Sequence, residues 1–448
     1  MFSFKIMIIF VLLKLLPNES KLVVMFKKKF IFSIFVVLIL NQIYAQDQLV
    51  FDNRIYRDNI HTVQIYRGGN QLNAPVIKFN SDERIILGFD DFDQDNKDYY
   101  YSVYHCTYEW NADDLFFNEY AEGFDMNLID DYRNSFNTFQ KYKHYSLQIP
   151  NDDIKLLISG NYILSVFDGN DKDKPVLTRR FMVVEPSFNI QAEVKKPAMN
   201  QFRETHQRIE FSIQCPFKIA NPEEDVKVVL CQNMRWDNAI FNLPAQYYKG
   251  NDLVYNYEKE SLFPAGNEYR HADLKNVKNK ALGIADITYK EDLYHFWLEK
   301  DKKRNRIPFS GDEDFNGKRF IKLENNEDSD IDADYVWVHF SLECNQPFLG
   351  SKVFVFGELS DWQCSPPNEM QYNKVTSVYE SSMFLKQGYY NYEYVTLDET
   401  KGFIENQNTE GWFVSAENIY SIFTYYKEQG SRFYKLVGSK NINSIKNL

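Results

Sequence analysis

Short segments rich in Val, Ile, Phe, Tyr and Thr recur along the chain from His61 onwards, and each ends at Gly, Asn, Asp or Pro. This alternation of apolar runs and turn residues is typical of β-strands, and helical periodicity is nearly absent. Their spacing favours antiparallel sandwiches over alternating strands and helices, so the pattern predicts an all-β protein. The strands that it predicts in the first part of the chain are Thr62–Tyr66, Ile85–Phe89, Tyr99–Tyr108, Tyr145–Ile149, Tyr162–Phe167 and Phe181–Val184.

Two interruptions divide the predicted strands into three groups. The first is Glu185-Pro186, where a strand ends and a proline cannot donate to a ladder. The second is the acidic run Glu324–Asp334, because clustered like charges favour extended, solvated chain. The sequence therefore predicts three consecutive immunoglobulin-like or E-set-like β-sandwich domains. They span residues 46–186, 187–325 and 335–437, with an acidic linker at 326–334 and a flexible tail at 438–448.

The amino-terminal residues have the pattern of a targeting signal. Met25 is followed by a lysine-rich start, an apolar stretch from Phe30 and a small residue, Ala45, which is the order that a signal peptidase reads. We therefore expect residues 25–45 to be a signal peptide that is cleaved after Ala45. Because this signal is complete by itself, residues 1–24 are interpreted as an extension from a mispredicted start codon rather than as a second membrane anchor.

The charge balance is acidic and excludes several classes of partner. The chain has 51 Lys and Arg against 63 Asp and Glu, a formal charge of −12, and removing residues 1–45 brings this charge to −17. Such a charge disfavours nucleic acid and anionic lipid surfaces. After Gln46 no run approaches the roughly 18 apolar residues that a membrane helix needs. Since 44% of the residues are apolar, a core is expected, and the sequence indicates an exported, folded, acidic protein.

The common catalytic signatures are missing from the sequence. There is no G-x-S-x-G elbow, no P-loop, no H-E-x-x-H and no G-x-G-x-x-G before a helix. The most catalytic-looking cluster is His105, Thr107 and Glu109, which would share one face of an extended strand. The alternative is that the opposite face, with Tyr104 and Cys106, packs in the core while this face meets solvent. We predict no catalytic residue.

Two acidic loops, Asp91–Asn96 and Asp312–Gly317, place Asp at alternate positions, as calcium loops do. The first lacks Gly at the sixth position, and the second has Leu323 rather than Glu at the twelfth. The five cysteines include no C-x-x-C and indicate neither a zinc site nor a disulfide framework, although Cys215–Cys231 or Cys344–Cys364 could pair. We predict no metal site and no cofactor.

Two motifs combine Arg with aromatic residues and are candidates for a protein interface. Trp, Tyr and Arg are the residues that most often dominate protein interfaces, but they also serve as turn and cation–π residues inside a fold. Both interpretations stay open. The candidate interface residues are Arg235, Trp236, Asp237 and Asn238 in the first motif and Glu268, Tyr269 and Arg270 in the second.

The third group of strands is similar to glycogen- and starch-binding sandwich modules. The likeness rests on Val353–Trp362, Met370 and Gly388–Tyr394. In those modules exposed aromatic residues form a glucan platform, for which Trp362 and Trp412 are the candidates here. An exported carbohydrate-binding accessory protein is therefore the alternative function, against the interpretation of Trp362 as a core or turn anchor.

The whole chain from about Asn59 to Gly438 resembles the type IX secretion system plug proteins of Bacteroidota. The motifs that carry the resemblance keep the order and spacing of that family: Thr62–Arg67, Phe89–Asp93, Tyr99–Tyr101, Arg133–Thr138, His144–Leu147, Leu177–Pro186, Arg235–Ala239, Phe263–Glu268, Ala333–Val336 and Leu385–Tyr392. The sequence departs from the family at Gln94, where Gly is expected.

The resemblance implies a non-enzymatic protein of the periplasm, at the periplasmic face of the outer membrane. Its implied partner is the SprA-type outer-membrane β-barrel translocon, whose periplasmic mouth it would seal when no substrate is in transit. It would be peripheral to the membrane through that partner and would bind no nucleic acid. No motif of the family identifies the residues that touch the barrel.

Overall fold

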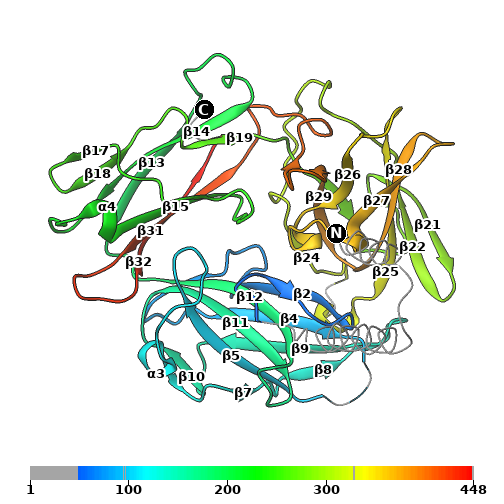
Figure 1. Ribbon diagram of the computed structural model, residues 1–448. Coiled ribbons are helices and arrows are strands. Elements are labelled where there is room, and N and C mark those ends of the chain that lie inside the picture. The colour runs from blue at the N-terminus through cyan, green and yellow to red at the C-terminus, as the bar shows by residue number, and fades with distance from the viewer. Residues whose placement is uncertain (1–48, 94, 96, 326–327, 446–448) are drawn as a thin grey trace, which may run out of the picture. The chain divides into compact units, whose positions relative to one another are not determined.

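The computed structural model describes residues 49–93, 95, 97–325 and 328–445 (Figure 1). The predicted signal peptide and the extension before it lie outside the described residues. The described chain is almost entirely β-structure, as the apolar pattern predicts, and the strands form several sheets. The all-β prediction is therefore confirmed.

The first sandwich packs two sheets on one core. One sheet has the order β1 (Arg54–Ile55), β12 (Pro175–Val184), β11 (Gly160–Asp168), β5 (Tyr99–Cys106) and β7 (Asn127–Leu128), with β3 (Val76–Lys78) parallel to β12. The other sheet has the order β2 (Ile60–Arg67), β4 (Ile85–Asp91), β9 (Lys143–Ile149) and β8 (Tyr132–Asn134). A short pair, β6 (Ala121–Gly123) and β10 (Ile154–Leu156), lies beside them. Apolar residues of both sheets, among them Leu87, Val103, Leu147 and Leu164, form the core.

The second sandwich is built from two stretches of chain that are far apart in the sequence. Its first sheet has the order β13 (Asn189–Lys195), β14 (His206–Gln214), β18 (Asp252–Tyr255) and β17 (Tyr247–Lys249), with β19 (Leu262–Pro264) also on β14. Its second sheet has the order β16 (Ile240–Phe241), β15 (Val226–Gln232), β31 (Ile419–Tyr426) and β32 (Lys435–Asn443). The carboxyl-terminal strand β31 thus lies beside β15, with β32 on its other side (Figure 1).

The third sandwich is one eleven-stranded sheet that curls around its own core. Its main path is β20 (Arg270–Asp273), β29 (Tyr389–Asp398), β26 (Ser351–Phe356), β27 (Glu369–Asn373), β28 (Val378–Lys386), β25 (Tyr335–Glu343), β22 (Leu293–Leu298) and β21 (Ile284–Lys290). Three short strands join it: β23 (Asp301–Lys302), β24 (Arg319–Phe320) and β30 (Ile404–Glu405). Phe340 of β25 contacts Tyr392 of β29 with ring centroids 5.0 Å apart, although several strands separate the two in the sheet.

The order of strands along the chain differs from the expected consecutive order. Residues 270–273 and 293–298 fall within the span expected for the second sandwich, but they form β20 and β22 of the third. Residues 419–426 and 435–437 fall within the span expected for the third, but they belong to β31 and β32 of the second, and β32 continues into the expected tail. The physical reason is that β31 supplies Tyr420 and Ile422 to the core of the second sandwich, which its own early strands leave incomplete. The third sandwich is therefore inserted into the second.

The expected acidic linker also differs from an extended chain. Asp328 caps a short helix, α5 (Ser329–Asp332), by accepting the N–H of Asp330. Asp334 is buried and accepts backbone N–H groups from Phe139 and Gln140 of the first sandwich. These carboxylates satisfy backbone donors instead of keeping the segment solvated, because a buried N–H needs an acceptor.

A further apolar core joins the first and second sandwiches. It contains Ile163 of β11 and Val184 of β12 together with Val229 of β15 and Phe423 of β31. Because each of these strands packs a core on both faces, β11 and β31 are buried along almost their whole length. Among the described residues no helix is long and apolar enough to cross a membrane, and the remaining helices are single turns: α3 (Phe117–Tyr120), α4 (Pro222–Asp225), η1 (Glu358–Ser360) and η2 (Pro366–Asn368).

Candidate functional site

Arg235 of the first interface motif lies in the turn between β15 and β16, and its side chain is only 11% exposed. Its guanidinium pairs with Asp237 (Nη2 to Oδ2, 2.7 Å) and with Glu393 (Nη1 to Oε1, 3.2 Å). It also lies 5.1 Å from the ring centroids of Phe356 and Trp362. Glu393 is on β29, so Arg235 links the second sandwich to the third instead of facing solvent.

The other residues of this motif are also engaged within the chain. The Trp236 ring packs edge-on against Trp110 of the first sandwich at 4.9 Å and stacks on Phe423 at 5.9 Å. The Asn238 side chain donates to Gln232 Oε1 (3.1 Å). Through Arg235 and Trp236 this turn touches all three sandwiches, which is the structural role that the cation–π interpretation of the motif predicts.

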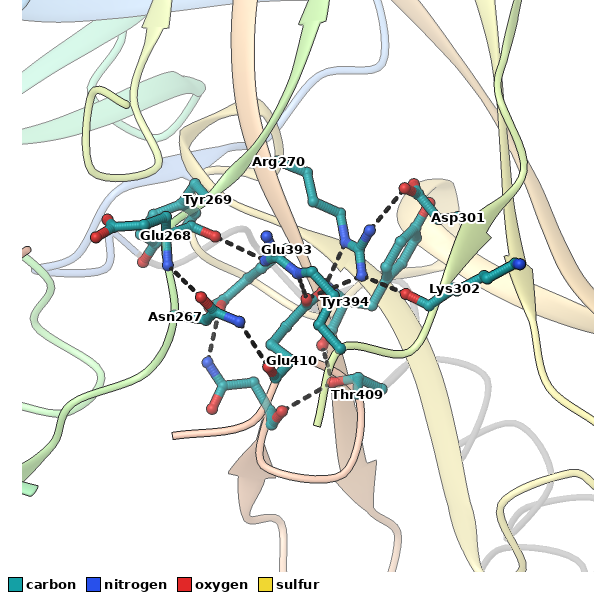
Figure 2. Close-up of polar contacts among 12 residues, drawn as sticks. Asn267, Glu268, Tyr269, Arg270, Asp301, Lys302, Glu393, Tyr394, Thr409 and Glu410 are labelled. Carbon is teal, nitrogen blue, oxygen red and sulfur yellow. Dashed lines mark hydrogen bonds and ion pairs between the residues drawn. The ribbon is translucent and has the colours of Figure 1, made fainter. Parts of the chain in front are cut away.

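The second motif surrounds a buried carboxylate, Glu410 (Figure 2). Arg270 donates to both Glu410 oxygens at 3.0 Å, and its remaining nitrogen reaches Asp301 Oδ1 (2.6 Å). Arg304 adds a bond from its Nε to Glu410 Oε2 (2.7 Å), and the Tyr394 N–H adds another. Burial opposes the charged form of Glu410, but Arg270 and Arg304 hold its pKa below the ordinary value.

Glu268 and Tyr269 lie where the chain crosses from the second sandwich to the third. Both side chains are buried, and Glu268 Oε1 accepts the N–H of Glu417 (2.9 Å), which lies on the return crossing. Asp314 accepts the N–H of Tyr269. Burial, with the neighbouring Asp314 and Glu417 charges, raises the pKa of Glu268 to about 8, and burial raises that of Asp314 to about 6.

The structure thus brings the two motifs together through β29, where Glu393 binds Arg235 and the next residue, Tyr394, packs under Arg270. Burial raises the pKa of Glu393 to about 7, against the lowering effect of Arg235. The arginine charges are matched by carboxylates of the same chain at hydrogen-bond distance. Chemically this arrangement stabilises the junction of the sandwiches and leaves these groups engaged rather than presented to a partner.

A buried ion pair that the sequence reasoning missed joins the first sandwich to the third. Lys386 of β28 pairs with Asp90 of β4 (Nζ to Oδ2, 2.7 Å), and both side chains are 1% exposed. Tyr335 donates to the same Oδ2 (2.6 Å), and His144 Nδ1 lies 2.7 Å from Oδ1. Burial opposes the charge of Asp90, but Lys386 and His144 hold its pKa below the ordinary value. The signal in the sequence was Asp90, a charged residue that directly follows the predicted strand Ile85–Phe89.

The catalytic-looking cluster is not assembled. β5 ends at Cys106, so Thr107 and Glu109 lie in a turn and do not continue the face of His105. His105 is buried, with its Nδ1 2.9 Å from Asp113 Oδ2 and its ring edge-on to Tyr162. Glu109 instead accepts a hydrogen bond from the Asn242 side chain (2.6 Å). The expected common face of His105, Thr107 and Glu109 does not form, because β5 ends at Cys106 and not at Tyr108 as predicted.

Trp362 and Trp412 contact different neighbours. Trp362 lies under the Arg235 guanidinium and is edge-on to Tyr269 (6.1 Å) and Phe356 (5.6 Å). Trp412 donates from Nε1 to Asn406 Oδ1 (2.6 Å) and is edge-on to His206. Both rings are half-buried, and Trp362 holds the position of the core or turn anchor that was the alternative to a sugar platform.

The acidic loops use their carboxylates for backbone and side-chain contacts. Asp91 accepts hydrogen bonds from Tyr99 and Asn59, and Asp314 accepts the N–H groups of Tyr269 and Asn316. Over the described ranges no three His, Cys, Asp or Glu side chains are gathered as a metal site would require. The five cysteines are free thiols, and four of them are buried.

Comparison with known proteins assigns the chain to a family. Residues 60–185, which make up most of the first sandwich, match the family described as type 9 secretion system plug protein 1st domain. A solved structure, a hypothetical protein from Parabacteroides merdae at 2.30 Å resolution, shares 33% identity with this chain and superposes with a TM-score of 0.85. That likeness covers 88% of this chain and 100% of the other, while no curated protein matches. This chain belongs to the type 9 secretion system plug protein family.

Proposed function

We propose that this protein is a non-enzymatic plug that binds the periplasmic mouth of the SprA-type outer-membrane translocon and seals it when no substrate is in transit. Family membership gives the chain a role in type IX secretion and an interaction with that secretion system. Closing a pore is a more specific role, and it requires a rigid protein that does not deform when it covers a large opening.

The observation that carries the proposal is the way in which buried contacts fix the three sandwiches to one another. An apolar core joins the first to the second, Asp90 and Lys386 join the first to the third, and Arg235 and Glu393 join the second to the third. Breaking any of these contacts exposes apolar surface or buried charge, which costs free energy. A body held in this way is suited to occluding a pore.

The acidic charge and the signal-like amino-terminal sequence support a periplasmic location at the outer membrane, reached through the protein partner. A removable stopper should use a moderate, partly polar interface, so that a substrate or another partner can displace it. The chemistry of the described side chains also favours binding over catalysis, because the buried carboxylates and guanidinium groups satisfy one another.

An affinity experiment tests the proposal directly. The chain, tagged at its carboxyl terminus, is expressed in its host and purified from detergent-solubilised envelope, and the co-purifying proteins are identified by mass spectrometry. We expect one very large outer-membrane barrel in stoichiometric amount. Recovery of soluble enzymes or polysaccharide without that barrel would contradict the plug function.

A further inference from the structure

Exposed aromatic side chains gather where the first sandwich meets the third. Phe136 is 70% exposed and Phe139 50% in the segment after β8, and Tyr289 is 51% exposed on β21. The ring of Phe139 lies 5.4 Å from that of Tyr289 and 5.9 Å from that of Tyr294, and the two tyrosines are 5.1 Å apart. We call Phe136, Phe139, Tyr289 and Tyr294 the aromatic surface.

The backbone beneath the aromatic surface is fixed. Asp334 accepts the N–H groups of Phe139 (2.7 Å) and Gln140 (3.1 Å), and Ile331 O accepts that of Phe136 (2.9 Å). Tyr142 donates from its hydroxyl to Ala333 O (2.7 Å). The aromatic rings are therefore held outward on an ordered segment, and a partner that contacts them pays little ordering entropy.

Carboxylates surround the aromatic surface. Asp328 and Asp330 of the α5 segment pair with Arg133, which lies three residues before Phe136. On the other side, Glu291 and Asp292 form the turn between β21 and β22, and Tyr289 donates to Asp292 (3.3 Å). Among the described residues, the cations near them are Arg133, Lys290, which pairs with Glu291 (3.2 Å), and Lys141, which donates to Thr138 O. These four carboxylates thus exceed the three cations by one, and the surroundings are weakly acidic.

We infer that the aromatic surface is a docking site for a protein loop of the translocon that packs an apolar or aromatic side chain onto the exposed rings and carries Lys or Arg beside it. This inference rests on the proposed plug function. Aromatic anchors in an ordered setting are the usual centres of binding energy, and the acidic surroundings select a basic partner. A second copy of this acidic chain, or an anionic lipid surface, would bring like charges together.

An exposed phenylalanine in another part of the first sandwich supplies a control. Phe116 is 73% exposed, close to the 70% of Phe136, and is followed directly by α3. A Phe→Ser change there removes the same side chain from a surface that is not part of the proposed site.

The test measures the affinity of the full chain for the translocon barrel purified in detergent from the same host. The variants are Phe136→Ser with Phe139→Ser, Phe136→Ser alone, and the control Phe116→Ser. We expect the double variant to bind about 10-fold more weakly or worse, the single variant to bind less tightly than wild type, and the control to bind as wild type does. High salt should weaken the wild-type complex, because the surroundings of the site are acidic.

Each outcome decides the inference. If wild type binds and both aromatic variants bind equally well, the aromatic surface is not the docking site, although the plug function stands. If wild type itself does not bind the barrel, both the inference and the proposed function fail. A wild-type dimer that the double variant dissociates, with unchanged barrel affinity, would identify a second copy as the occupant and overturn the inference. Because the Phe136 ring contacts no other aromatic ring among the described residues, the single variant should fold even if the double variant does not.

Discussion

The first sandwich is attached to its two neighbours by contacts of opposite chemistry. Its contact with the second sandwich is an apolar core that includes Ile163, Val229 and Phe423. Its contact with the third includes aromatic rings, such as Tyr142 against Tyr335, but it is built around the buried ion pair of Asp90 and Lys386. Tyr335 is hydrogen-bonded to the same carboxylate. Burial of apolar surface does not depend on protonation, whereas a buried ion pair holds only while both groups are charged.

This difference predicts that the free energy needed to separate the first sandwich from each neighbour responds differently to pH. Separating the first and second sandwiches would expose apolar surface at any pH. Separating the first and third would break the buried ion pair of Asp90 and Lys386, so the cost would depend on pH. The third sandwich is also tethered twice to the second, at Glu268 and Glu417, because it is inserted between β19 and β31.

The largest expected effect is on the ionic contact. Lys386→Ala removes the cationic partner of the buried Asp90, which keeps His144 and Tyr335, and should lower the free energy of unfolding by about 3–5 kcal/mol, measured by urea denaturation at pH 7. The pKa of Asp90 is below its ordinary value when folded, so the stability it contributes is present at neutral pH and is lost as pH falls through that folded pKa. The penalty of Lys386→Ala should therefore shrink in acid. The control, Lys386→Met with Asp90→Asn, removes both charges and should lose less, and an equal loss would contradict the ion-pair account.

A somewhat smaller effect is expected on the apolar contact. Ile163→Ala removes a fully buried side chain from the core between the first and second sandwiches and should cost about 2–4 kcal/mol. Unlike the Lys386 variant, its penalty should be the same at pH 5 and pH 8 in parallel urea titrations. A penalty that changes with pH would show that this contact is not purely apolar.

The next largest change in the free energy of unfolding is expected at Glu268, the buried carboxylate where the chain crosses from the second to the third sandwich. The pKa of Glu268 is raised to about 8, above its unfolded value, so the folded protein binds more protons and its stability falls as pH rises between those two values. Glu268→Gln removes this penalty and should raise the free energy of unfolding by about 2 kcal/mol at pH 6. At pH 4 the variant should match wild type, and a stabilisation equal at both pH values would contradict the assignment.

The smallest effect is expected at the exposed ion pairs beside the aromatic surface. Arg133 is 44% exposed, and its pairs with Asp328 and Asp330 meet water and salt. Arg133→Ala should therefore change the free energy of unfolding by no more than about 0.5 kcal/mol. A loss as large as that of Lys386→Ala would mean that the exposed pairs, and not Asp90, hold the first and third sandwiches together.

The strands could be predicted from the sequence because their apolar period is local. The predicted strand Ile85–Phe89 corresponds to β4, and Tyr145–Ile149 lies within β9. The order of the sandwiches could not be predicted, because β15 pairs with β31 across nearly two hundred intervening residues and neither strand carries a sign of its partner.

The candidate site was predictable only in part. The sequence identifies the two arginine motifs as candidates for an interface or for internal packing. It does not distinguish an exposed Arg from one that pairs with Glu393 or Glu410 far along the chain. The aromatic surface was missed because Phe136 and Tyr289 belong to different sandwiches and look like ordinary strand-end residues in the sequence. Their exposure becomes visible only when both sandwiches are folded and placed.

The most direct test of the plug function is the electrical conductance of the purified translocon barrel in a planar lipid bilayer, recorded before and after this protein is added to its periplasmic side. The account predicts that the open-pore current falls to the level of the bare membrane and returns when the protein is washed out. A current that stays unchanged while the protein is bound in stoichiometric amount would contradict it.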